Sequence, residues 1–204
     1  MPVAEVAATL LGQAGPVDGR PVVVGVDGRS SSGKTTVAGR LAATVHGAVV
    51  IHTDDVAWHH AFFDRADLLA DGVLTPARQG LAVSYRPPAW DARGRTGAIE
   101  VPGGAAMLVV EGVGAARGQL SHLLDASLWV QSDLAETDRR NAGRVAAGEM
   151  TPSDFAAWMT EEVPFQAGQR SWERANLIVT GTPGLAHDPS TELVVADPPG
   201  REPG

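Results

Sequence analysis

Lys34 is the only lysine of this chain, and it stands in a motif whose residue types and spacing suit phosphate binding. Residues 28–35 read Gly-Arg-Ser-Ser-Ser-Gly-Lys-Thr and match the pattern G-x-x-x-x-G-K-[ST]. In such a loop, backbone N–H groups hold the phosphates of a nucleotide, a compact ammonium lies along the β- and γ-phosphates, and the next hydroxyl ligates Mg²⁺. The motif predicts a site for ATP and Mg²⁺ with Lys34 as a catalytic residue. The expected nucleotide-binding residues are Gly28, Arg29, Ser30, Ser31, Ser32, Gly33, Lys34, Thr35 and Thr36.

The residues on either side of the motif predict the strand and the helix that such a loop requires. Residues 21–26 are a short apolar, β-branched run, which is typical of a strand buried on both faces. After the loop, apolar side chains recur with helical spacing, and the N-terminus of that helix would add to the anion site. Asp27, directly before the loop, could cap its backbone or support the metal. The alternative is an ordinary glycine–serine loop, which would require neither the strand before it nor the helix after it.

Carboxylates follow two further predicted strands, at the edge where parallel sheets bind ligands. Asp54 and Asp55 come directly after the second strand, and Glu111 follows the third. We expect Asp54 to accept the proton of a substrate hydroxyl and orient it for attack on the γ-phosphate. Glu111 is expected to hold a Mg²⁺-bound water beside Thr35, so that Thr35, Asp54 and Glu111 form the metal site. The alternatives are a helix N-cap for the two aspartates and a solvated strand end for Glu111.

An arginine-rich helix is predicted from Asp133 onward, because the D-x-x-E spacing is typical of helix starts. Arg140 and Arg144 are four residues apart and share one face of this helix. As part of a lid they could neutralise charge on the transferring phosphoryl group, which can raise the rate about 10³- to 10⁵-fold. The alternative is a solvated surface on which arginines pair with Glu136 or Asp138.

Five of the ten aromatic residues fall between positions 58 and 90, beside several polar side chains. Flat apolar groups next to polar ones could stack a base or enclose a sugar. The alternative is a small helical subdomain whose aromatic residues form its own core. Phe155 and Trp158, in the next predicted helix, are interpreted as core residues. The expected substrate-binding residues are Asp55, Trp58, His59, Phe63, Asp64, Tyr85 and Arg86.

Composition narrows the class of protein. The net charge is −8 and the arginines are scattered, which argues against binding to duplex nucleic acid. The absence of cysteine excludes disulfides and thiolate metal sites and suits a cytoplasmic protein. No apolar run approaches the length of a membrane span, and the N-terminal residues do not resemble a signal peptide. We therefore expect a cytoplasmic protein with a small-molecule partner and no membrane partner, and an oligomer of identical chains is compatible with these features.

The order of predicted elements indicates an α/β fold. Strands are expected at 21–26, 48–52, 107–110, 126–130 and 176–179, with helical patterns between them. This alternation predicts a three-layer α/β/α P-loop NTPase fold with a five-stranded parallel sheet and a small helical lid. Residues 1–182 would form the domain, with the lid at about 133–168 and the acceptor region at about 54–95. Residues 183–204 would be a loose tail, apart from an edge strand at 193–195, and residues 3–11 suggest a docked amphipathic helix.

Together these residues resemble the uridine kinase-like branch of P-loop phosphotransferases, over roughly residues 20–182. The resemblance rests on the phosphate loop, Thr53-Asp54-Asp55, Tyr85-Arg86-Pro87, Glu111-Gly112, Arg139-Arg140 with Arg144, and residues 169–179. It implies transfer of the γ-phosphate of ATP, with Mg²⁺, to a hydroxyl of a small molecule such as uridine or cytidine. It also implies that Asp54 is the catalytic base, that the lid arginines contact phosphates, and that the aromatic segment after the base holds the nucleoside.

Two departures from the family pattern affect the acceptor and the lid. Val145 follows Arg144, where the family has an Arg-Asp pair, and Phe62-Phe63-Asp64 stands where the family has a His-Pro-Asp segment. Other acceptors therefore stay open: pantothenate, a sugar, a monophosphate or a specialised metabolite, as does a non-catalytic nucleotide-binding protein. A GTPase with an Asn-Lys-x-Asp guanine motif is excluded, because Lys34 is the only lysine.

Overall fold

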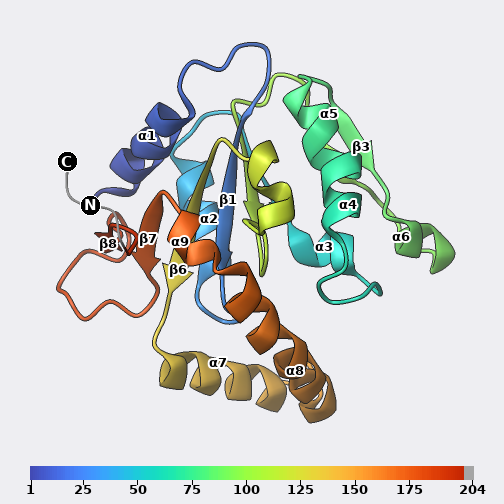
Figure 1. Ribbon diagram of the computed structural model, residues 1–204, viewed down its shortest axis with the longest axis vertical. Coiled ribbons are helices and arrows are strands. Elements are labelled where there is room, and N and C mark those ends of the chain that lie inside the picture. The colour runs from blue at the N-terminus through green and yellow to red at the C-terminus, as the bar shows by residue number, and fades with distance from the viewer. Residues whose placement is uncertain (200–204) are drawn as a thin grey trace.

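A mostly parallel six-stranded sheet forms the centre of the molecule in the computed structural model, which describes residues 1–199 (Figure 1). The strand order is β2–β5–β1–β6–β7–β8. The α/β class is confirmed: the sheet has five parallel strands, and a short antiparallel strand at the β7 edge brings the count from the predicted five to six. The strands are β1 (Val22–Gly28), β2 (Ala48–His52), β5 (Met107–Glu111), β6 (Ala126–Gln131), β7 (Leu177–Thr180) and β8 (Val195–Ala196).

The neighbouring strands β1 and β5 are mostly apolar because both of their faces are covered. Every residue of β1 and of β5 is buried. Successive side chains of a strand point to opposite faces, so Val24 and Val26 join one core cluster while Val23 joins the other. The first cluster lies under α1 (Val3–Ala14) and α2 (Lys34–Ala43). The buried Val3, Val6, Ala7 and Leu10 show that α1 docks on the sheet as an amphipathic helix.

The second core cluster lies under a series of short elements. These are α3 (Thr53–Ala57), α4 (Ala66–Leu69), the π-helical η1 (Ala70–Leu74), α5 (Thr75–Arg78), α6 (Pro88–Ala92) and the 3₁₀-helical η2 (Gly118–Leu123). A two-stranded antiparallel sheet of β3 (Val83–Tyr85) and β4 (Ile99–Val101), which the sequence did not predict, completes this region. The Tyr85 ring packs on Gly72, where a Cβ would lie 2.4 Å from the ring. Tyr85 is thus part of the packing of this region.

The strand register places the carboxyl ends of the parallel strands level with one another at one edge of the sheet. Glu111 is level with Val26 of β1 and with His52 of β2, and Gly28 is level with Val130 of β6. Because these strands are parallel, the segments that follow them all leave the sheet at the same edge. The helices α7 (Leu134–Ala146) and α8 (Pro152–Gln169) lie beyond that edge, followed by the short α9 (Ser171–Arg174) (Figure 1).

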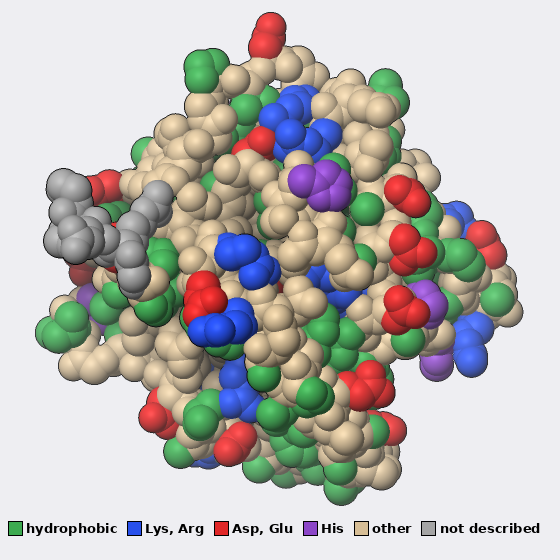
Figure 2. All heavy atoms as spheres, in the orientation of Figure 1, with side chains coloured by type: hydrophobic (Ala, Val, Ile, Leu, Met, Phe, Trp, Pro, Cys, Tyr) green, Lys and Arg blue, Asp and Glu red, His purple; other side chains and the backbone are tan. Residues whose placement is uncertain are grey.

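The helices α7 and α8 are less covered than the rest of the chain. Figure 2 shows hydrophobic side chains over the end of the molecule that they form, and Leu134 and Val163 expose more than half of their surface. The buried residues of the two helices are all polar: Thr137, Asn141, Glu162 and Gln166. Their attachment to the sheet therefore depends more on polar contacts than on buried apolar area.

The segment after β7 returns across the sheet edge to the N-terminus. Backbone hydrogen bonds in both directions join Met1 and Leu193, and Thr180 N donates to Val194 O. Leu193 is buried in the first core cluster. The edge strand expected at 193–195 is present as β8, which begins two residues later, at Val195. Residues 200–204 of the expected tail lie outside the described residues. Among the described residues, no helix combines the length and apolar character needed to cross a membrane.

Candidate functional site

The phosphate loop joins β1 to α2 in the way that the motif requires. The strand ends at Gly28, and the helix begins at Lys34. Gly33 has a φ of 99°, a left-handed conformation that favours glycine. At Gly28, with φ 154°, a Cβ would lie 2.6 Å from the Val130 carbonyl oxygen of the neighbouring strand. Both motif glycines are therefore needed for the path of the backbone, and the loop leads directly into the first turn of α2, where N–H groups lack partners within the helix.

Asp27 fixes the base of the loop. Its side chain is completely buried, and its carboxylate accepts hydrogen bonds from Gly28 N (2.7 Å), Gly114 N (2.8 Å) and Ala116 N (3.0 Å). Burial raises the pKa of Asp27, and the three N–H donors act in the opposite direction. The carboxylate thereby ties the loop after β1 to the loop after β5, which is the backbone-capping role considered from the sequence.

Lys34 is buried, and its ammonium donates to Arg29 O at 2.7 Å. Burial lowers the pKa of Lys34, while the carboxylates of Glu111, Asp27, Glu162 and Asp54 raise it. Carboxylates from β1, the end of β5, α3 and α8 therefore surround this single ammonium. Such a site favours a ligand that brings both phosphate groups and a cation.

Glu111 has one carboxylate oxygen engaged and the other without a partner. Glu111 Oε1 accepts a hydrogen bond from Thr35 Oγ1 (3.2 Å) and lies 2.6 Å from His52 Nδ1. Glu111 Oε2 is buried and has no hydrogen-bond partner among the described residues. A buried carboxylate oxygen without a partner is costly, and with the Thr35 hydroxyl it offers the hard oxygen ligands that Mg²⁺ prefers. The donor set fits the metal expected from the sequence.

A cavity of about 790 Å³ opens over the phosphate loop. Its volume lies in the range that small-molecule sites occupy. Ten predicted site residues line it: Ser30, Ser31, Gly33, Lys34, Thr35, Thr36, Asp54, Glu111, Arg140 and Arg144. Phe155 and Trp158 also line it, so their interpretation as core residues was wrong. Residues of the segment 180–194 also line it, including Pro183, His187 and Pro189, to which no role was assigned from the sequence.

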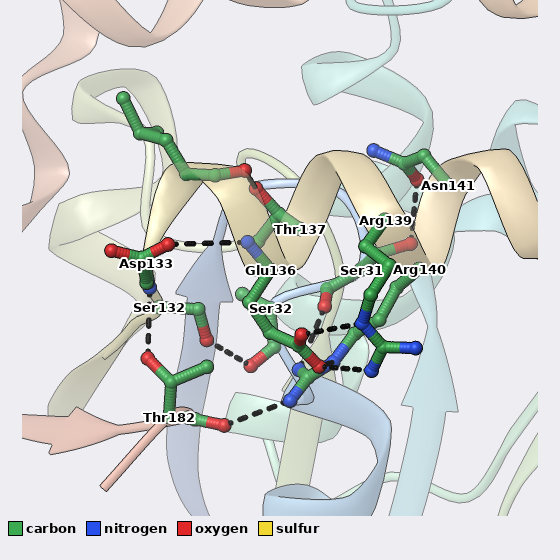
Figure 3. A network of polar contacts seen from close by, with 12 residues as sticks. Ser31, Ser32, Ser132, Asp133, Glu136, Thr137, Arg139, Arg140, Asn141 and Thr182 are labelled. Atoms are coloured by element: carbon green, nitrogen blue, oxygen red, sulfur yellow. Dashed lines mark hydrogen bonds and ion pairs between the residues drawn. The ribbon is translucent and has the colours of Figure 1, made fainter. Parts of the chain in front are cut away.

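Arg140 connects α7 to the phosphate loop and to the end of β7 (Figure 3). Its guanidinium donates to Ser31 O at 3.1 Å and Gly181 O at 3.2 Å, and its Nε donates to Glu136 at 2.7 Å. Arg139 pairs with the same glutamate, and hydrogen bonds from Arg139 and Arg140 lower the pKa of Glu136 to about 2. The surface pairing considered as an alternative is thus present, but Arg140 also reaches the loop.

Each of the three loop serines contacts a different element beyond the loop. Ser31 Oγ donates to Asn141 Oδ1 of α7 at 2.6 Å, and the Ser32 carbonyl accepts from Ser132 Oγ after β6 at 2.8 Å (Figure 3). Ser30 N donates to Glu162 Oε1 of α8 at 2.7 Å, and its hydroxyl donates to the same carboxylate. Sequence reasoning missed Asn141 and Glu162, because polar residues within a helix usually face solvent.

The predicted acceptor residues divide into two groups, and the lining of the large cavity includes neither group. Asp55 pairs with Arg95, whose guanidinium lies over the rings of Trp90 and Trp58. Arg86 bonds to Asp91 and to two backbone carbonyls of the β3–β4 connection. These contacts give the first group a place in the packing of the region, and its role in substrate binding stays a prediction.

In the second group, only Phe63 is in contact with α8 among the described residues. Phe63 stacks on Phe165 with ring centroids 4.3 Å apart and also contacts Trp158. His59, with a φ of 54°, lies edge-on to Trp58, and Tyr85 lines a separate hollow with Asp67 and Asp71. Asp64 contributes to the charge environment of the buried Arg117. The structure thus brings Phe63 next to the cavity wall formed by Trp158, whereas Tyr85 faces elsewhere.

Two buried arginines that the sequence did not single out join the acceptor region to the sheet edge. Arg65 donates to Thr53 Oγ1 (3.2 Å) and Val113 O (3.0 Å), and Arg117 donates to Gly114 O (3.0 Å) and Phe63 O. Burial, followed by the charge of Arg117, lowers the pKa of Arg65 to about 10. The two arginines thus hold in place the segments that follow the carboxyl ends of β2 and β5.

Solved structures share this fold. A candidate fructose transport system kinase from Silicibacter sp. TM1040 superposes with a TM-score of 0.62 and 19% identity, covering 86% of this chain and 95% of that chain. A candidate uridine kinase from Bacillus stearothermophilus gives 0.50 and 17%, covering 85% and 98%. The YGR205w protein gives 0.55 and 10%, covering 88% and 93%. No protein-family model and no curated protein matches the sequence. The comparisons show the P-loop kinase fold, which confirms the resemblance at the level of the fold.

Proposed function

We propose that this chain is a kinase that transfers the γ-phosphate of ATP, with Mg²⁺, to a hydroxyl group of a small molecule. One observation carries the proposal: the Glu111 carboxylate holds the Thr35 hydroxyl and keeps a buried oxygen that has no partner among residues 1–199, at the cavity that Lys34 and Asp54 also line. A phosphate loop alone indicates nucleotide binding. The added carboxylates supply what phosphoryl transfer requires, namely metal ligands and a proton acceptor.

The chain's own groups hold the donor. Loop amides and the first turn of α2 bind phosphate oxygens, and Lys34, which donates to the Arg29 carbonyl, lies along the β- and γ-phosphates. Thr35, Glu111 and Asp54 are the residues that would hold Mg²⁺, which when bound neutralises charge on the phosphates. The nucleoside part of the donor lies against residues 180–194.

Asp54 orients the acceptor hydroxyl and takes its proton. As the hydroxyl oxygen bonds to the γ-phosphorus, the bond from that phosphorus to the β–γ bridging oxygen breaks, and ADP leaves. Arg140 and Arg144, which line the same cavity, neutralise charge on the transferring group. The polar buried faces of α7 and α8 support a lid that docks and withdraws. Catalysis then rests on position and electrostatics.

A nucleoside such as uridine or cytidine is the acceptor we favour, on the sequence resemblance, with Trp58 and Phe63 as aromatic partners. The alternative acceptors are a sugar, pantothenate, a monophosphate or a specialised metabolite. The alternative function is that of a non-catalytic nucleotide-binding protein. A cytoplasmic location belongs to the same proposal, and an oligomer of identical chains stays a prediction.

Release of ADP across a panel of nucleosides, sugars and hydroxy acids tests the proposal. The wild-type chain should release ADP with at least one acceptor. Asp54→Asn should lower turnover by at least about 10²-fold, the scale of general-base catalysis, and raise the Kd of Mg·ATP by a smaller factor, because Thr35, Glu111 and the loop amides remain. Asp138→Asn, at an exposed position of α7, is the matched control. Full turnover by Asp54→Asn would assign the base to another group, and no release with any acceptor would favour the binding protein.

A further inference from the structure

Glu162 is a completely buried carboxylate that the proposed reaction does not use. It projects from the middle of α8 and accepts hydrogen bonds from Ser30 N, Ser30 Oγ and Trp158 Nε1. Its neighbour Glu161 is exposed on the same helix. A buried charge costs free energy unless it is paired and hydrogen-bonded. The burial of Glu162 therefore requires a structural explanation, whereas the exposed Glu161 requires none.

The Arg29–Ser30 peptide group connects Glu162 to Lys34. The N–H of this peptide unit, which belongs to Ser30, donates to Glu162 Oε1 at 2.7 Å. Its carbonyl, which belongs to Arg29, accepts from Lys34 Nζ at 2.7 Å. The described residues contain no cis peptide bond, so the N–H and the carbonyl point in opposite directions. One peptide group therefore lies between a buried anion and a buried cation.

This order of charges makes the two hydrogen bonds support each other. Both involve an ionised partner, and such bonds are shorter and stronger than neutral ones. The carboxylate draws the amide hydrogen, the cation draws the carbonyl oxygen, and each polarises the peptide in the sense that strengthens the other bond. No direct ion pair between Glu162 and Lys34 occurs among the described residues, so the peptide is their link.

Trp158 fixes the carboxylate end of this chain of contacts. Its indole N–H donates to Glu162 and to the Ser30 hydroxyl, and its ring packs between Phe62 and Phe63 while lining the large cavity. The position of α8 is thereby coupled to the peptide on which the lysine rests. Withdrawal of α8 would remove the anion and free the peptide to turn.

We propose that Glu162 is a positioning residue that holds the Lys34 ammonium over the phosphate loop by orienting the Arg29–Ser30 peptide from the opposite side. The consequence for catalysis rests on the proposed function. Through Glu162, the position of α8 determines the position of Lys34, the residue that contacts the triphosphate. The geometry itself exists in the nucleotide-free chain. It can therefore be tested without nucleotide.

The single lysine supplies a direct probe. Lysine labelled with carbon-13 at the ε position gives one side-chain resonance, from Lys34. In the wild-type chain this methylene should be ordered. In Glu162→Gln, which keeps the shape of the side chain and removes its charge, the resonance should move and its order parameter should fall below about 0.6, the range of mobile groups. Glu161→Gln is the matched control and should leave the resonance unchanged.

Trp158→Phe is a second variant, which keeps a ring against Phe62 and Phe63 and removes the N–H that fixes the carboxylate. It should shift the Lys34 resonance in the same direction by a smaller amount, and it decides the matter if Glu162→Gln does not fold. An unchanged, ordered resonance in folded Glu162→Gln overturns the proposal, even if its melting temperature falls. The same change in Glu161→Gln overturns it too, because the effect would then be one of net charge.

Nucleotide binding separates this proposal from the proposed function. Mg·ATP should shift the Lys34 resonance of the wild-type chain, and the Kd for Mg·ATP should rise about 10-fold in Glu162→Gln and stay constant in Glu161→Gln. A Kd unchanged in Glu162→Gln would count against the positioning role. A wild-type chain that does not respond to Mg·ATP refutes the proposed function alone, and the comparison of nucleotide-free variants still decides whether Glu162 orders Lys34.

Discussion

Replacement of Asp27 by asparagine should destabilise the chain and loosen the phosphate loop together. The buried carboxylate accepts three backbone N–H groups, two on Oδ1 and one on Oδ2. Asparagine keeps one carbonyl oxygen, so it can retain the bonds from Gly28 and Gly114, but at neutral rather than charge-assisted strength. Its NH₂ group would face the N–H of Ala116, and that donor would lose its partner.

The magnitude follows from these three bonds. Two bonds weakened by about 1 kcal/mol each and one buried donor left unpaired, at about 1–3 kcal/mol, sum to about 3–5 kcal/mol. Removal of a buried charge offsets part of this loss, because burial raises the pKa of Asp27 and so opposes its ionised form. The expected net loss is about 2–4 kcal/mol in the free energy of unfolding.

Urea unfolding at neutral pH measures this loss, with Asp71→Asn as a matched control in a region away from the phosphate loop. For a chain of this size a loss of about 3 kcal/mol corresponds to a fall of roughly 6–12 °C in melting temperature. Mg·ATP affinity should fall in the same variant, because the loop after β1 loses its tie to the loop after β5. A loss below about 1 kcal/mol would refute the account of Asp27 as the anchor of the loop.

Three further outcomes are expected. Lys34→Ala should abolish turnover and weaken Mg·ATP binding, as measured by ADP release and calorimetry; turnover close to wild type would show that the lysine is dispensable. Arg140→Ala should lower kcat about 10³-fold or more in steady-state kinetics, since it removes a cation from the loop and the cavity wall; an unchanged kcat would make Arg140 structural only. Burial raises the pKa of Asp125, but hydrogen bonds from Arg20, the Val23 N–H and Arg78 outweigh it and bring the pKa to about 2. Because the pKa of Asp125 is lower in the folded chain than its unfolded-state value of 3.8, ionised Asp125 stabilises the fold at pH values above 3.8. This contribution is at most about 2 kcal/mol after solvent screening, and it is lost as the pH falls toward 2. In urea unfolding, the difference between wild type and Asp125→Asn should therefore shrink between pH 5 and pH 2, and a constant difference would contradict this assignment.

The central sheet could be predicted from the sequence because burial imposes a simple pattern. Strands covered on both faces, such as β1 and β5, are apolar over most of their length, and Val22–Val26 and Met107–Val110 show this directly. Residues that follow such strands lie at one edge by topology, so the meeting of Lys34, Asp54 and Glu111 at one cavity could be expected.

Contacts between distant polar residues could not be predicted in this way. Glu162 and Ser30 are 132 positions apart, and nothing in the sequence of α8 distinguishes the buried Glu162 from the exposed Glu161. The β3–β4 pair was missed because each strand has three residues, too few to show an alternating pattern. The bonds of Arg86 with its own segment could not be read from the sequence either, and its role in substrate binding stays a prediction.

Calorimetric titration of the wild-type chain with Mg·ATP tests the central claim most directly. The wild-type chain should bind one nucleotide, with a Kd in the range of about 1 μM to 1 mM that is usual for enzyme substrates, and Lys34→Ala should lose this binding. A wild-type chain that takes up no Mg·ATP, or a Lys34→Ala variant that binds it equally well, would contradict the account.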